Sequence, residues 1–212
     1  MKNELMNIKE VSAQLVKQDA DKIINVSTIE KVDNSFLVFI GNGVPGMPGY
    51  GAEAITFSSR FYNLIICDNE KLDTAGTITI NRRHCLVEND DITQDLKEKY
   101  SSLTSEAIVE LMTFPCLVAN KNAHDGWADD NQVAILAKLE SVAVSDENIK
   151  LQYRAMFGVS QAKLCKLIEE LGISGRYGRH NEWNHCHWTV KEKDLCTVIN
   201  GAGLNPTVQN RK

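Results

Sequence analysis

Short apolar runs rich in β-branched and aromatic residues, each too brief for a typical helix, constrain this chain more than any other feature. Residues 35–40 and 62–67 are two such runs, and residues 77–80 alternate polar and apolar side chains. Runs of four to eight residues with this composition are typical of strands. The stretch 132–157 predicts two strands joined by a turn at 145–148. We therefore expect a β-rich body.

Helices are expected at both ends of the chain and between some strands. Residues 3–17 carry apolar side chains at helical spacing. Thr104 and Ser160 are candidate N-caps of two further helices. Thr189 and Glu192 match a capping box and predict a last helix. The fold class predicted is α+β: a mixed or antiparallel β-rich body with an N-terminal helix and a helical, basic C-terminal end.

Charge is distributed unevenly along the chain, whose formal net charge is −5. Residues 1–149 hold 13 Lys and Arg against 23 Asp and Glu, a balance of −10, whereas residues 150–212 hold 10 against 5, a balance of +5. We predict an acidic α/β body over 1–149 and a basic C-terminal subdomain over 150–212, or a single compact domain containing both. A basic end can guide an acidic partner to one side of the molecule.

The sequence predicts a cytoplasmic protein that does not enter a membrane. No apolar run approaches the ~20 residues that span a bilayer, and residues 1–21 lack the apolar core of a signal peptide. The six cysteines are widely spaced and form no CxxC pair. Four of them have apolar neighbours in the sequence, which is typical of reduced core thiols rather than a disulfide framework.

The segment 176–188 concentrates groups that bind ligands, with three of the five histidines and two of the three tryptophans. Arginine and lysine bind phosphates, and flat aromatic rings stack on bases. If these rings converge on an accessible surface, they predict a site for a nucleic acid, a nucleotide-like ligand or a partner protein. The alternative is that the rings fill the interior and bond only within the chain. The candidate ligand-binding residues here are Arg176, Tyr177, Arg179, Trp183, His185, His187, Trp188 and Lys191.

The same histidines suggest a second reading, in which the protein is a metal-dependent hydrolase or nuclease. His185 and His187 are two positions apart, so an extended backbone directs both imidazoles to one face. With His180 or Glu182 they could supply three ligands to zinc or another divalent metal and leave a position open for water. The spacing matches no standard zinc signature.

A glycine-rich loop follows the apolar run at 35–40, and its residues 41–46 fit the pattern GxGxxG. Glycines at this spacing let a dinucleotide pyrophosphate approach the backbone. Pro45 and Pro48 interrupt the place where the required helix would start. We interpret the loop as a recognition edge that involves Gly43, Gly46 and Tyr50, with a nucleotide-binding role as the alternative.

Two further motifs are weaker. Arg82-Arg83-His84-Cys85 follows a strand and could bind an anion, although a basic strand end is the preferred interpretation. The loop from His124 to Asp130 could hold a hard cation but lacks the pattern of a calcium loop. The leading hypothesis is therefore a small cytoplasmic binding or regulatory protein that performs no covalent chemistry.

Overall fold

A computed structural model describes residues 26–32, 35–40, 53–68, 70–73, 75–86, 92–175 and 181–204, with the backbone alone for residues 26–54. The predicted helix over residues 3–17 and the glycine-rich loop with Gly43, Gly46 and Tyr50 lie outside these ranges.

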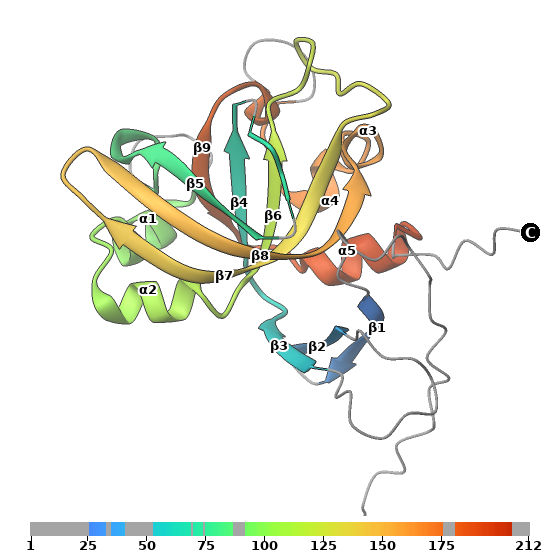
Figure 1. The fold of residues 1–212 in the computed structure, drawn as a ribbon, viewed down its shortest axis with the longest axis horizontal. Coiled ribbons are helices and arrows are strands. Elements are labelled where there is room, and N and C mark those ends of the chain that lie inside the picture. The colour runs from blue at the N-terminus through green and yellow to red at the C-terminus, as the bar shows by residue number, and fades with distance from the viewer. Residues whose placement is uncertain are drawn as a thin grey trace, which may run out of the picture.

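A mixed six-stranded sheet forms most of the structure (Figure 1). β4 and β6 run parallel, and every other neighbouring pair in this sheet is antiparallel. In spatial order the strands are β5 (Ala75–Asn81), β8 (Asn148–Ser160), β7 (Val133–Val144), β6 (Pro115–Asn120), β4 (Tyr62–Cys67) and β9 (His187–Lys191).

The sheet curls until its two edges meet. Cys85, which follows edge strand β5, forms a parallel bridge with Trp188 of the opposite edge strand β9. The Leu86 N–H donates to the Trp188 carbonyl at 2.9 Å. Closing a sheet in this way satisfies backbone groups that an open edge leaves exposed.

Strand β4 shows how the curled sheet divides the core, because all six of its residues are buried. Side chains alternate between the two faces of a strand. Ile65 and Cys67 therefore point into the cluster enclosed by the sheet, which we call the inner cluster. Tyr62, Leu64 and Ile66 join the cluster on its outside, the outer cluster. Coverage on both sides explains why this run is continuously apolar.

Short helices cover the sheet rather than forming a layer of their own. α1 (Gln94–Tyr100) and α2 (Ser105–Leu111) contribute apolar side chains to the inner cluster. Thr104 caps α2 as predicted, because its side chain accepts a hydrogen bond from the Ala107 N–H at 3.2 Å. The outer cluster takes in side chains from α3 (Gln161–Leu164), α4 (Ile168–Leu171) and α5 (Leu195–Gly201).

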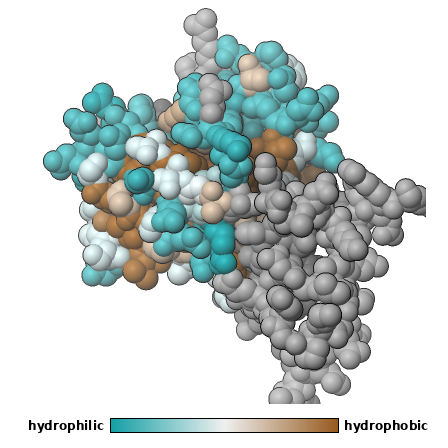
Figure 2. Space-filling model, in the orientation of Figure 1, coloured by the Kyte–Doolittle hydropathy of each residue, from teal (hydrophilic) through white to brown (hydrophobic). Residues whose placement is uncertain are grey.

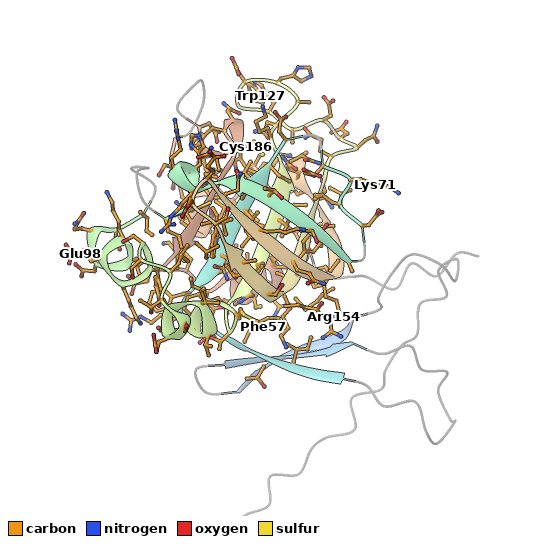
Figure 3. The ribbon with its side chains drawn as sticks, turned by 60° about the vertical axis from the view of Figure 1, so that its left-hand side comes forward. Phe57, Lys71, Glu98, Trp127, Arg154 and Cys186 are labelled. Atoms are coloured by element: carbon orange, nitrogen blue, oxygen red, sulfur yellow. The ribbon has the colours of Figure 1, made fainter. Side chains whose placement is uncertain are left out.

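A second sheet of three antiparallel strands comprises β1 (Val26–Val32), β2 (Ser35–Ile40) and β3 (Glu53–Ser58). Phe57 of β3 is buried in the outer cluster, which joins the two sheets (Figure 3). Figure 2 shows apolar surface on the lower left of the main body, over α2 and the end of β7, where Val109 and Val144 are exposed.

The predicted fold class is wrong, because the structure is mostly a mixed sheet with few and short helices. The basic C-terminal end is not a helical unit. The expected helix after Ser160 is divided into α3 and α4, because Leu167 between them leaves helical torsion angles (φ −113°, ψ 25°). The region around Thr189 is strand β9, whose pairing with β4 outweighs the local capping pattern. The last helix begins only at Leu195, capped by Asp194.

Several local predictions are confirmed. β2 and β4 have the bounds of the predicted runs, 35–40 and 62–67. β7 and β8 form the predicted hairpin, and the Ser145 N–H donates to the Asn148 carbonyl at 2.9 Å in its turn. These elements depend on composition and turn residues that are local in the sequence.

Candidate functional site

Three ionisable side chains of the C-terminal segment form a buried ion cluster, which consists of Glu182, His187 and Lys191. Glu182 lies in a 3₁₀ turn, η2 (Glu182–Asn184), and the other two lie on one face of β9. One carboxylate oxygen of Glu182 accepts from His187 Nε2 at 3.0 Å and from Lys191 Nζ at 2.8 Å. The other accepts from the Ser174 backbone N–H at 2.8 Å. The three side chains are at most 5% exposed, so water contributes little to their solvation.

Both ring nitrogens of His187 have partners within the chain. Nε2 faces the Glu182 carboxylate, and Nδ1 faces the His185 carbonyl at 2.9 Å. Both partners are oxygen atoms of the chain that accept hydrogen bonds. Each nitrogen is thus already engaged by the chain itself, and neither faces a metal or a substrate. The arrangement is that of a structural ion cluster rather than a proton-transfer site.

The two tryptophans of this segment are interior residues. Trp188 belongs to the inner cluster, and its Nε1–H donates to Asn63 Oδ1 at 3.0 Å. Asn63 in turn donates to the Leu111 carbonyl at 2.8 Å. Trp183 belongs to the outer cluster and is fully buried. Its Nε1–H has no hydrogen-bond partner among the described residues.

The expectation that these rings converge on an accessible surface is therefore wrong for Trp183, Trp188 and His187, and Lys191 is buried with them. The physical reason is that β9 lies in the sheet beside β4, where both faces of the sheet are covered. No sequence signal places β9 there, because its partner strand precedes it by more than a hundred positions. The role of these residues as ligand contacts stays a prediction.

The structure brings only some of the predicted site residues together. The rings of His185 and His187 lie 4.6 Å apart between centroids, as expected for two residues on one face, and His185 is half-buried. Arg176, Tyr177, Arg179 and His180 lie outside the described residues. Within the described ranges no group of three or more His, Cys, Asp and Glu side chains is arranged to hold a metal.

A cleft of about 640 Å³ opens where the end of β5 meets the tip of the β7–β8 hairpin and the turn between α1 and α2. We call it the Arg82–Arg83 cleft. Arg82 and Arg83 lie in a 3₁₀ turn, η1 (Arg82–His84), directly after β5. The residues that line the cleft are Asn81, Arg82, Arg83, Ser101, Ser102, Asp146 and Glu147.

Backbone contacts fix the walls of this cleft. The Arg82 N–H donates to the Glu147 carbonyl at 2.8 Å, which ties η1 to the hairpin tip. The Asn81 side chain accepts from the Arg83 N–H at 3.1 Å and so caps η1. The Arg82 guanidinium makes a long contact of 3.4 Å with the Ser145 carbonyl. The Arg83 guanidinium is exposed and has no hydrogen-bond or ion-pair partner among the described residues.

Strained backbone supports both walls. Leu103, which follows Ser102, has φ 48°, and Leu86, two residues after η1, has φ 59°. A leucine in this left-handed region costs about 1–2 kcal/mol, because its Cβ crowds the backbone. Both leucines are buried in the inner cluster, and their burial offsets the strain. The turns that present the arginine and serine side chains are thus held by the core.

The sequence alone favours interpreting these two arginines as a basic strand end. The missing signal was spatial, because the hydroxyls of 101–102 and the carboxylates of 146–147 reach the arginines only through the fold.

No protein-family model matches the chain, and neither a curated protein nor a solved structure is significantly similar to it. Among the described residues, no helix is long and apolar enough to cross a membrane.

Proposed function

We propose that this protein is a binding protein for a small phosphorylated ligand that also carries hydroxyl or amino groups, such as a nucleotide. The observation that supports this proposal is that two guanidinium groups and two serine hydroxyls line one cleft of about 640 Å³. Guanidinium binds phosphate with two parallel hydrogen bonds, and hydroxyls add further donors. The volume is in the range of ~300–1,000 Å³ usual for small-molecule pockets.

The acidic residues of the cleft narrow the class of ligand. Asp146 and Glu147 are exposed at the hairpin tip and offer only acceptors while ionised. A ligand made of phosphates alone would be repelled by them. A ribose hydroxyl or a base amine donates to such carboxylates while a phosphate binds the arginines. This pairing favours a mononucleotide or sugar phosphate over a long nucleic acid backbone.

We also propose that the protein acts in the cytoplasm. All six cysteines are unpaired in the structure, which agrees with a reducing compartment. The C-terminal segment supports the core in this proposal, since Glu182, His187 and Trp188 are engaged with the chain itself.

Isothermal titration calorimetry with three probes tests the proposal: ATP, ribose 5-phosphate and inorganic phosphate. Arg83→Ala should weaken the binding of all three about 10–100-fold, because a charge-assisted hydrogen bond contributes about 1.5–3 kcal/mol. Asp146→Asn should weaken the two sugar-bearing probes and should not weaken inorganic phosphate, which the carboxylate repels. The matched control is Arg60→Ala, because Arg60 is also exposed but pairs with Glu192 elsewhere on the surface.

Equal binding by the Arg83→Ala and Arg60→Ala proteins would contradict the site. If the wild-type protein binds none of the three probes at millimolar concentration, the proposed ligand class is wrong.

A further inference from the structure

Two cysteines lie opposite each other where β4 ends and β9 begins. The antiparallel register of these strands pairs Tyr62 with Lys191 and continues to Ile66 with His187. One residue further, the same register places Cys67 opposite Cys186. Side chains directly opposite in an antiparallel pair point to the same face of the sheet. Cys186 is thus directed to the inner side, as are Cys67 and Trp188.

The hydrogen bonding of Cys67 specifies what kind of cross-strand pair this is. The Lys121 N–H donates to the Cys67 carbonyl at 2.8 Å, so the backbone groups of Cys67 point toward β6 and away from β9. Cys67 and Cys186 are therefore a non-hydrogen-bonded pair. Cα atoms in such pairs are about 4.5 Å apart, closer than in hydrogen-bonded pairs. That separation lies within the range of ~4.4–6.8 Å that a disulfide spans.

The surroundings of the two thiols differ in a way that assigns them different roles. Cys67 is 3% exposed, and burial followed by the charges of Glu70 and Cys186 raises its pKa to about 12. Cys186 is half-buried, and its raised pKa also comes first from burial, but the Lys121 ammonium opposes the increase. Cys186 is thus the more accessible thiol, and Cys67 lies behind it within the curled sheet. Both are unpaired in the structure.

We propose that Cys67 and Cys186 are a redox-active pair that closes to a cross-strand disulfide by exchange with a small disulfide such as oxidised glutathione. The Cys186 thiolate attacks one sulfur of glutathione disulfide, which forms a mixed disulfide and releases one glutathione thiolate. The Cys67 thiolate then attacks the Cys186 sulfur and releases the second glutathione. Two protein thiols are oxidised, one glutathione disulfide is reduced to two glutathiones, and the two protons pass to the released thiolates.

The disulfide would link β4 to β9, two neighbouring strands that are more than a hundred residues apart in the sequence. It would fix the edge strand β9 at the end where Lys121 forms an ion pair with Asp68 at 2.8 Å. Figure 3 marks Cys186 at this end of the sheet, beneath the loop that carries Trp127. That loop is tied to the same segment, since the Gly126 N–H donates to Asn184 Oδ1 at 3.2 Å. Oxidation is therefore expected to stiffen this end of the molecule.

The test incubates the folded full-length protein with an excess of oxidised glutathione, followed by acid quenching and thiol counting in denaturant. The six thiols should fall to four, and peptide mapping should recover one disulfide between the Cys67 and Cys186 peptides. Because the thiolate is the attacking species, the rate should rise about tenfold per pH unit between pH 7 and 8. The oxidised protein should also unfold at a higher temperature than the reduced protein.

Two variants complete the experiment. After the same incubation, the Cys186→Ser protein should keep all of its remaining thiols free and should contain no disulfide. Cys165→Ser is the matched control, because Cys165 is likewise half-buried but lies at the end of α3, outside β4 and β9; this variant should still lose two thiols. Persistence of six thiols in the wild type, a stable glutathione adduct on Cys186 without ring closure, or a disulfide between other cysteines would each overturn the proposal.

Discussion

Replacing Glu182 by glutamine should destabilise the protein strongly, because it removes the only negative charge of the buried ion cluster while preserving its shape. Glu182 is fully buried and accepts hydrogen bonds from His187 Nε2, Lys191 Nζ and the Ser174 N–H, at 3.0, 2.8 and 2.8 Å. Without the carboxylate, the buried Lys191 ammonium loses the counter-charge that Glu182 supplies, and His187 loses an acceptor. Removing one partner of a buried ion pair costs about 3–5 kcal/mol. That range is a large fraction of the ~5–15 kcal/mol by which proteins are usually stable.

Urea unfolding of the Glu182→Gln protein measures this cost directly as a decrease in the free energy of unfolding. The matched control is Glu192→Gln, which breaks the exposed pair between Glu192 and Arg60. Such surface pairs contribute about 0–1 kcal/mol. Adding Lys191→Met to Glu182→Gln should recover part of the loss, because it removes one unpaired charge. If Glu182→Gln lowers the free energy of unfolding no more than Glu192→Gln does, the buried ion cluster does not stabilise the fold.

Two further predictions concern buried thiols and a crowded glycine. Burial raises the pKa of Cys116 from 9.0 to about 12, so this thiol stabilises the fold fully below pH 9 and loses that contribution as the pH rises toward 12. Between pH 10 and 11 the unfolded thiol is ionised and the buried one is not, so the free energy of unfolding should fall by about 1.4 kcal/mol per pH unit less steeply in Cys116→Ala than in the wild type. Equal slopes in this range would contradict the prediction. Gly76→Ala should destabilise the protein, because a Cβ at Gly76 would lie 2.6 Å from the Tyr153 hydroxyl, whereas Gly201→Ala meets nothing within 4 Å. Thermal unfolding should therefore show a lower midpoint for Gly76→Ala but not for Gly201→Ala. Equal midpoints for the two variants would show that the Tyr153 side chain moves aside without loss of stability.

The parts of this fold that the sequence predicts are those with local causes. The run 62–67 is continuously apolar because both faces of β4 are covered, and this pattern is visible without a structure. The turn at 145–148 and the cap at Thr104 depend on residues only a few positions apart. The strand at 187–191 escaped prediction because its side chains mix His, Trp, Thr, Val and Lys, a composition shaped by a buried ion cluster rather than by uniform apolarity.

The candidate site shows the same division between local and distant causes. Imidazole and indole in 176–188 suggested an exposed ligand site, yet Trp188 finds its partner at Asn63, 125 positions away. Three separate turns line the Arg82–Arg83 cleft, and only the turn with the two arginines has a recognisable motif in the sequence. Pairings of this kind are set by tertiary contacts that no local pattern encodes.

The meeting of β9 with both β4 and the segment after β5 has a consequence for how the molecule is made. On the ribosome, β4 emerges more than a hundred residues before β9 and has no partner on that edge until β9 has been synthesised. Contacts between such distant segments are slow to form, and an unpaired strand edge invites association with other chains. A nascent chain stalled before β9 would thus be prone to aggregate, and completing translation is what removes that hazard.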